Sequence, residues 1–292
     1  MKSILSAVLI FLTVMATGTV SCGHPSTEFA LVINADPMPF SAVLQKDSPL
    51  YEVQKSVFFV RVEFKYIYNS MPYTISGWAT AFPISKRKIV TCKHVVYPEK
   101  YDYNYNFYSV NGNITHVSRK IYLWRPGQIH TTPDGKYNVA VALQLGRDFK
   151  IARTLPDVLT EHKVARDEGP RSFYTHATST NDVALFEAKR DLVVKPLKLG
   201  SITDADKGKK VILIGYPLGL RSMDTKVVNP SVSVGYVRKV ETYIRFTSPV
   251  IGGNSGGPVV TEDGTVVGIV AFRFTEAIGF ALKTDRIRLL LR

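Results

Sequence analysis

The sequence predicts an all-β protein in which short antiparallel strands form barrels or sandwiches and one helix follows the last strand. Short apolar segments recur along the 292 residues and are separated by turn residues. Residues 284–291, at the end of the chain, combine helical spacing with a capping residue. Apolar residues make up 45% of the chain and charged residues 21%, which is sufficient for a sizeable core.

The first predicted strand shows the β pattern most clearly. Apolar and charged side chains alternate with the two-residue period of a half-buried strand. The inward set is Val60, Val62, Phe64 and Tyr66, and the outward set is Arg61, Glu63 and Lys65. Before this strand, the proline-containing residues 23–50 predict a linker or extended arm. Two short strands follow it, at 77–82 and 88–92.

The stretch 97–178 is the hardest to assign. It holds a tyrosine-rich run at 101–108 and a candidate strand at 139–145. The strand pattern returns after residue 182, with predicted strands at 183–187, 210–215, 231–240, 243–247, 257–260, 266–272 and 278–282. A turn at 262–264 joins two of these as a hairpin. The terminal helix is expected over 284–291, with Thr284 as its N-cap.

Residues 1–22 have the pattern of an export signal. Lys2 precedes an uncharged apolar run, 4–16, and small residues follow. The run is shorter than the roughly 20 residues of a membrane-spanning helix. Residues 19–22 resemble a bacterial lipobox, which makes Cys22 the candidate lipidation site, with plain secretion and an uncleaved signal anchor as alternatives. We therefore expect an exported protein that is periplasmic, membrane-anchored or extracellular.

Composition excludes several classes of protein. Only two cysteines are present, so neither a disulfide-rich scaffold nor a Cys-x-x-Cys zinc site can form. The six histidines are scattered, and we expect no metal and no cofactor. The formal charge of +13 suits an anionic surface or polymer, or simply a solvated basic face. No nucleic-acid motif accompanies it, so no nucleic-acid partner is expected.

The strongest chemical signal is Gly-Gly-Asn-Ser-Gly-Gly-Pro at 252–258. Glycines around Ser255 let the backbone take positive φ angles and direct several amides to one point, as an oxyanion requires. A glycine-rich turn without chemistry is the simpler interpretation. The motif also fits the nucleophile elbow of α/β-hydrolases, but that fold needs a histidine after the serine. The last histidine here is His176.

A base and an acid must therefore precede Ser255, as in the order His, Asp, Ser. His94 lies in Thr-Cys-Lys-His-Val-Val after a β-type segment, and Asp182 begins an apolar strand. Asp134 and Asp148 are rivals for the acid. Each residue taken alone has ordinary structural interpretations, but the ordered set favours a catalytic triad.

These motifs resemble the trypsin-like serine proteases, above all their HtrA (Deg) branch. The resemblance covers roughly residues 51–290. It rests on the segments Gly77 to Phe82, Thr91 to Val96, Asp182 to Leu185, Gly253 to Pro258 and Ile278 to Leu282. It implies two six-stranded antiparallel β-barrels with the active site between them, followed by the short helix. The barrels are expected at 51–199, including the 97–178 insertion, and at 200–292.

The resemblance also implies roles for individual residues. His94 is the expected general base and then acid, Asp182 orients it, and Ser255 is the nucleophile. The amides of Gly253 and Ser255 are the expected oxyanion hole. The substrate-binding set implied is Val250, Ile251, Gly252, Ala271, Phe272 and Arg273. Since residues 248–252 and 271–273 contain no acid, a small or medium apolar P1 residue is expected rather than Lys or Arg.

Two departures from the family pattern stand out. The spacing of 88 positions from His94 to Asp182 indicates an insertion, and no PDZ domain is expected after the terminal helix. The sequence thus predicts a secreted or lipid-anchored serine endopeptidase that acts on proteins or peptides through an acyl-enzyme. A catalytically silent binding protein on the same scaffold is the alternative. A lipidated Cys22 is the candidate route of membrane attachment.

Overall fold

A computed structural model describes residues 48–68, 70–98, 114–165, 173–219, 227–275 and 278–292. The predicted signal with Cys22, nearly all of the predicted arm and the tyrosine-rich run at 101–108 lie outside these residues. Within the described ranges, no helix has both the length and the apolar character needed to cross a bilayer.

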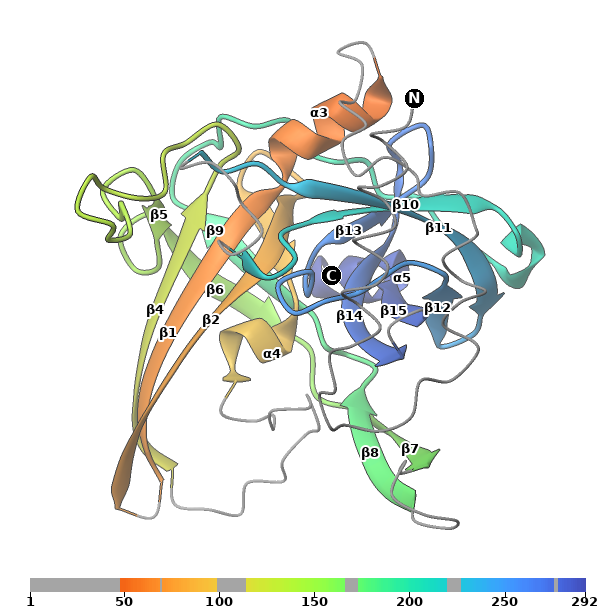
Figure 1. Cartoon of the computed structure of the whole chain (residues 1–292), viewed down its shortest axis with the longest axis horizontal. Coiled ribbons are helices and arrows are strands. Elements are labelled where there is room, and N and C mark those ends of the chain that lie inside the picture. Colours follow the sequence, from red (N-terminus) through yellow and green to blue (C-terminus); the bar gives the residue numbers. More distant parts are fainter. Residues whose placement is uncertain (1–47, 69, 99–113, 166–172, 220–226, 276–277) are drawn as a thin grey trace, which may run out of the picture. The chain divides into compact units, whose positions relative to one another are not determined.

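The N-terminal half is a seven-stranded antiparallel sheet (Figure 1). Its strands stand in the order β5-β4-β1-β2-β3-β9-β6. Their bounds are β1 Phe58–Tyr68, β2 Met71–Pro83, β3 Lys88–Thr91, β4 Ile114–Trp124, β5 Leu143–Gln144, β6 Phe149–Thr154 and β9 Ala184–Ala188. In β1, Val60, Val62 and Phe64 are buried, as the alternating pattern predicts. On the other side of that strand, Arg61 pairs with Glu63.

This sheet departs from the predicted closed barrel at one seam. Strands β5 and β6 are its two edges, yet only the turn 145–148 separates them in the sequence. One isolated bridge, Leu145 to Phe149, joins them. Strand β5 contains only two residues, and both pair with β4 rather than with β6. The predicted strand at 139–145 is therefore confirmed only at its end, and the sheet forms half a barrel.

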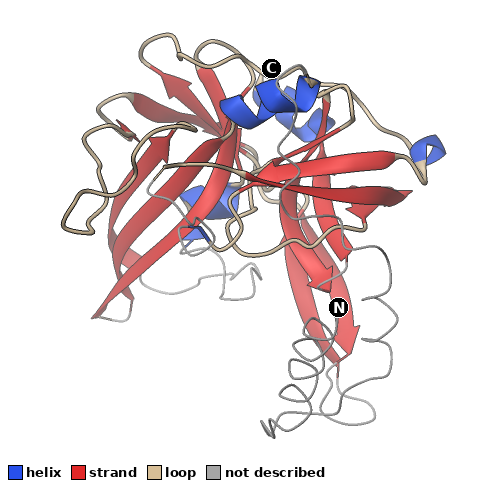
Figure 2. Ribbon diagram, turned by 45° about the horizontal axis from the view of Figure 1, so that its top comes forward, coloured by secondary structure: helices blue, strands red, loops and turns tan. Residues whose placement is uncertain are grey.

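The C-terminal half closes completely. Six strands form a barrel in the order β10-β11-β12-β15-β14-β13 (Figures 1 and 2). They are β10 Lys210–Gly215, β11 Ser231–Val240, β12 Tyr243–Phe246, β13 Pro258–Val260, β14 Val266–Thr275 and β15 Ile278–Lys283. These bounds agree closely with the predicted ranges. The predicted all-β, trypsin-like fold class is thus confirmed, with one closed barrel and one half-barrel.

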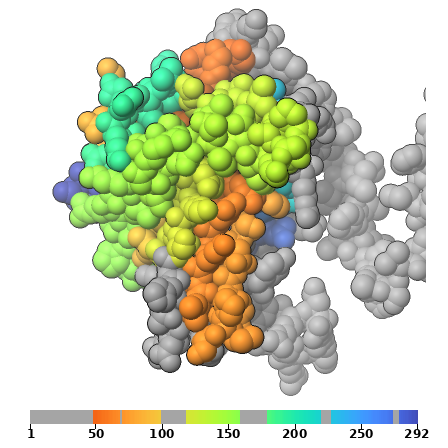
Figure 3. All heavy atoms as spheres, turned by 90° about the vertical axis from the view of Figure 1, so that its left-hand side faces the viewer, coloured from red at the N-terminus to blue at the C-terminus, as the bar shows by residue number. Residues whose placement is uncertain are grey.

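Part of the insertion forms its own hairpin. Strands β7 (Leu159–Ala165) and β8 (Phe173–Ser179) form a separate two-stranded sheet and lie below β12 and β14 in the view of Figure 1. Figure 3 looks onto the outer face of the N-terminal half, where residues of β4 to β6 and their connections (yellow-green) lie above β1 and β2 (orange). The hairpin ends at Ser179, three residues before Asp182, so it leads directly into the predicted site.

Three α-helices complete the described fold, together with a short 3-10 turn, η2 (Asp204–Asp206). Helix α4 (Lys93–Val96) carries His94, and α5 (Thr284–Leu290) follows the barrel. Helix α3 (Pro49–Ser56) begins inside the predicted arm, and the Ser48 side chain accepts a bond from the Leu50 amide. Its signals, a capping serine and a proline at the first turn, were present in the sequence. The predicted N-cap of α5 is wrong: Lys283 occupies it, because the Thr284 hydroxyl donates to the Gly200 carbonyl instead.

Candidate active site

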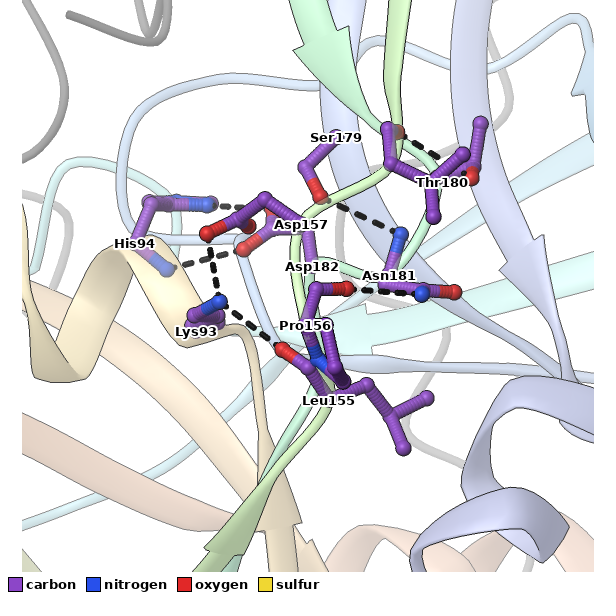
Figure 4. Close-up of polar contacts among 10 residues, drawn as sticks. Lys93, His94, Leu155, Pro156, Asp157, Ser179, Thr180, Asn181 and Asp182 are labelled. Carbon is purple, nitrogen blue, oxygen red and sulfur yellow. Dashed lines mark hydrogen bonds and ion pairs between the residues drawn. The ribbon is translucent and has the colours of Figure 1, made fainter. Parts of the chain in front are cut away.

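Asp182 holds His94 through two hydrogen bonds (Figure 4). The His94 backbone amide donates to Asp182 Oδ1 over 2.8 Å, and His94 Nδ1 lies 2.6 Å from Oδ2. Both residues are nine-tenths buried or more. Helix α4, which carries His94, directly follows β3, and Asp182 directly precedes β9. Since β3 and β9 are neighbours in the sheet, the two residues are brought together where β3 ends and β9 begins.

The contact with Asp182 determines which ring nitrogen of His94 carries the proton. An ionised carboxylate only accepts hydrogen bonds, so Nδ1 must be the donor. In the neutral imidazole, the lone pair is then on Nε2. That nitrogen is the one that a general base of the His-Asp-Ser type uses.

The loop around Ser255 depends on glycine at two positions. Gly253 has φ +104° and Gly256 has φ +83°, in the region that residues with a Cβ rarely adopt. A Cβ on Gly253 would lie 2.1 Å from the Tyr216 carbonyl oxygen. A Cβ on Gly256 would lie 2.2 Å from the Thr80 carbonyl oxygen and 2.3 Å from Thr91 Oγ1. These positive angles confirm that the glycine-rich motif is a constrained loop.

The loop around Ser255 and the start of helix α4 are both bonded to one backbone carbonyl. The Val270 oxygen of β14 accepts from the Gly256 amide over 2.9 Å and from the Cys92 thiol over 3.0 Å. Gly256 follows Ser255, and Cys92 precedes His94 by two residues. The structure therefore brings the predicted nucleophile and base to one place between the barrel and the sheet. The Ser255 side chain is 8% exposed there.

Thr80 of β2 ties the serine loop to the N-terminal half. Its amide donates to the Ser255 carbonyl over 2.9 Å, and its hydroxyl donates to the Gly253 carbonyl over 2.7 Å. The same hydroxyl accepts from the Tyr216 amide over 3.1 Å. Thr80 is fully buried. It therefore fixes the backbone on both sides of Asn254.

We expect Thr80→Val to weaken both the loop and the catalysis that depends on it. Valine keeps the shape but leaves the Gly253 carbonyl and the Tyr216 amide without this partner. A buried group left unsatisfied costs about 1–3 kcal/mol, so the free energy of unfolding should fall by that amount. Misplacing the loop should lower kcat up to about a hundredfold. Denaturant titration and peptide-hydrolysis rates test this, with Thr80→Ser as the matched variant that keeps the hydroxyl. Equal rates in Val and Ser variants would contradict the assignment.

Cys92 lies beside His94 and Asp182. Ligating atoms of Cys92, His94 and Asp182 all lie within 4.8 Å of one another. Burial and the neighbouring Asp182 charge raise the pKa of the Cys92 thiol well above its usual range. The thiol therefore stays protonated near neutral pH and is a poor nucleophile.

The rival acids lie elsewhere. Asp134 is exposed and pairs with Lys136 over 2.8 Å, and hydrogen bonds from Lys136 and Thr132 lower its pKa. Asp148 accepts from the Gln144 amide at the turn between β5 and β6. Neither contacts His94, whereas Asp182 does.

The predicted substrate-binding residues differ in their surroundings. Val250 packs in the core of the barrel, and Ala271 is fully buried. Phe272 stacks on Phe280, with ring centroids 4.8 Å apart. Ile251 is partly exposed, and Gly252 and Arg273 are exposed. Ile251, Gly252 and Arg273 are therefore the members of the set with surface available to a substrate.

Three residues with structural roles at the site were missed by sequence reasoning. Thr80 and Lys93 lie inside motifs that were recognised for other residues, and Asp157 lies in the stretch that was hardest to assign. Lys93 is 4% exposed and forms an ion pair with Asp157. A lysine next to the histidine was a visible signal, but its partly buried partner is 64 residues away.

The comparison with known families agrees with this geometry. The chain matches the trypsin-like peptidase domain over residues 79–269. The span is more than half of the chain, and the chain therefore belongs to the family of trypsin-like peptidase domains. The resemblance to this family, inferred from the motifs, is confirmed.

The relatives include HtrA proteases. The chain is 28% identical to serine protease HTRA1B of Danio rerio over 212 residues, which are 67% of this chain and 43% of that protein. It is 30% identical to mitochondrial serine protease HTRA2 of Bos taurus over 112 residues, which are 37% of this chain and 24% of that protein. The match thus spans less than half the length of either curated relative.

A solved structure is also similar. The active form of the Rv3671c protease from M. tuberculosis aligns over 86% of both chains, with 17% sequence identity and a TM-score of 0.45.

Proposed function

We propose that the protein is a serine endopeptidase that hydrolyses protein or peptide substrates with Ser255 as nucleophile, His94 as general base and Asp182 as the residue that orients it. The observation that supports this most directly is the double hydrogen bond from His94 to Asp182 beside the glycine-rich loop of Ser255. Membership of the peptidase family supports the same chemistry.

In the proposed reaction, Nε2 of His94 takes the proton of the Ser255 hydroxyl as its oxygen attacks the scissile carbonyl. The resulting imidazolium is stabilised by the Asp182 carboxylate. The amides of Gly253 and Ser255 hold the oxyanion. The imidazolium then protonates the leaving amine, the C–N bond breaks, and an acyl-enzyme remains on Ser255. Water, deprotonated by His94, releases the acid and restores the serine.

Labelling with a fluorophosphonate tests this proposal against the alternative of a silent binding protein. A serine activated by a base reacts covalently with this probe, and an ordinary serine does not. We expect one adduct, on the peptide that contains Ser255, and hydrolysis of casein by the unlabelled protein. A folded protein that neither reacts nor cleaves casein would support the binding-protein alternative.

We also propose that the protein is exported and attached to a membrane through lipid on Cys22. The support is sequence pattern alone: Lys2, the apolar run 4–16 and the lipobox-like residues 19–22. Stable attachment takes more than one acyl chain or a second signal. The basic surface implied by the charge of +13 supplies attraction to anionic head groups as well.

Cys22→Ser is expected to move the protein from the membrane fraction to the soluble fraction. Salt at about 1 M should not release the unaltered protein, because it screens charges and does not reach buried acyl chains. Cell fractionation with mass spectrometry of the mature N-terminus measures both. An unmodified N-terminal peptide would leave plain secretion in place of anchoring.

A further inference from the structure

The residue before His94 is a buried lysine with two partners on one segment. Lys93 Nζ donates to the Leu155 carbonyl over 2.8 Å and lies 2.6 Å from Asp157 Oδ2. The side chains of Lys93 and Asp157 are 5% and 15% exposed. Because both side chains are largely shielded from solvent, the pair is held in a narrow geometry. Exposed ion pairs in the described chain, such as Lys150–Glu187, are not restricted in this way.

The same segment is bonded to the residues before Asp182. Asn181 Nδ2 donates to the Pro156 carbonyl over 2.7 Å, and the Thr180 amide donates to the Val158 carbonyl over 2.8 Å. We call residues 155–158 the clamp segment. It runs between the neighbour of His94 on one side and the neighbours of Asp182 on the other (Figure 4).

These contacts form a closed chain of bonded residues that includes His94 and Asp182. From His94 this closed chain passes through Lys93, the clamp segment and Asn181 to Asp182, and the hydrogen bonds of Asp182 to His94 complete it. We propose that Lys93 and Asp157 are positioning residues, which hold helix α4 at the distance from Asp182 that keeps His94 oriented as a base. The proposal rests on the proposed protease function.

The electrostatic part of the proposal follows from the charges near His94. Among the described residues, the ionisable groups on or against helix α4 include Asp182, Cys92, the Lys93–Asp157 pair and Arg119, which donates to the Val96 carbonyl over 3.1 Å and is unchanged in both variants below. With both partners present, the pair adds little net charge. Removing one partner leaves the charge of the other uncompensated close to the His94 imidazole, which must gain and lose a proton. The two single variants should therefore disturb His94 in opposite directions.

Steady-state kinetics across pH with Lys93→Met and Asp157→Asn test the clamp. Both should lower kcat, by up to about a hundredfold, with little change in KM. In Lys93→Met the bare Asp157 carboxylate stabilises the imidazolium, so the acid limb of the kcat/KM profile should move to higher pH. In Asp157→Asn the bare ammonium destabilises it, so that limb should move to lower pH. A residue that only stabilises the fold gives no such opposite shifts.

A double variant guards against loss of folding. Lys93→Met with Asp157→Asn leaves no uncompensated charge, so its acid limb should return to the position of the parent protein while kcat stays low. If kcat also returns, or if the single variants shift the limb in the same direction, the clamp proposal is wrong. Active-site titration with the fluorophosphonate corrects each rate for the folded, competent fraction.

The matched control is Lys150→Met, which removes an exposed lysine paired with Glu187 over 3.0 Å between β6 and β9 of the same sheet. It should keep the parent kcat and pH profile. Failure of the clamp and failure of the protease function remain distinguishable: an inactive, unlabelled parent protein refutes the function, whereas an active parent with unchanged variants refutes only the clamp.

Discussion

Replacing Ser255 by alanine is expected to lower kcat for peptide hydrolysis by about six orders of magnitude. The hydroxyl is the group that bonds to the substrate carbonyl in the proposed reaction, so neither His94 nor the oxyanion amides can compensate for its loss. Folding should be unaffected, since the Ser255 contact with Thr80 runs through the backbone carbonyl and alanine keeps it. Initial rates on casein and on a fluorogenic peptide, with circular dichroism of each protein, measure both.

Ser201→Ala is the matched control, because Ser201 is an exposed serine outside the strands. It should retain the parent rate and the fluorophosphonate label. Casein hydrolysis that persists in purified Ser255→Ala, at a rate comparable to the parent, would show that another residue is the nucleophile.

Asp182→Asn is expected to lower kcat by about four orders of magnitude. The asparagine can keep its oxygen on the His94 amide, but its NH2 group then faces Nδ1, where the carboxylate accepted a proton. Nδ1 must become an acceptor, and the ring proton moves to Nε2. Nε2 then has no lone pair for the Ser255 hydroxyl, so the base is present in the wrong tautomer.

Asp134→Asn and Asp148→Asn serve as controls for that variant, because both carboxylates lie away from His94 and compete with Asp182 only in the sequence. Each should hydrolyse the fluorogenic peptide at the parent rate. Parent activity in Asp182→Asn, with loss in either control, would transfer the orienting role to the other acid.

The strands that were predicted well depend on local patterns. Residues 210–215 and 231–240 were expected as strands, and β10 and β11 occupy those same ranges. Their apolar periodicity and flanking turn residues contain the required information. Similarly, the His94 and Asp182 contact followed from motif order, since both motifs are compact in sequence.

The features that were missed depend on contacts distant in sequence. Periodicity over 139–145 did not reveal that β5 contains only two residues, which pair with β4 and leave the seam toward β6 open. The Lys93–Asp157 pair joins residues 64 positions apart, and Asp157 lies in a stretch without a clear pattern. Threonine is a common N-cap residue, but the Thr284 hydroxyl donates to the Gly200 carbonyl, which is distant in the sequence.

The hydrogen bond from the Cys92 thiol to the Val270 carbonyl has a practical consequence. Cys92 leads into helix α4 of the N-terminal half, Val270 belongs to the barrel, and the thiol is fully buried between them. An alkylating reagent can reach that sulfur only when the two halves part or the chain unfolds. The rate at which Cys92 is alkylated in native buffer therefore measures how often the two halves separate at the interface where His94 and the Ser255 loop lie.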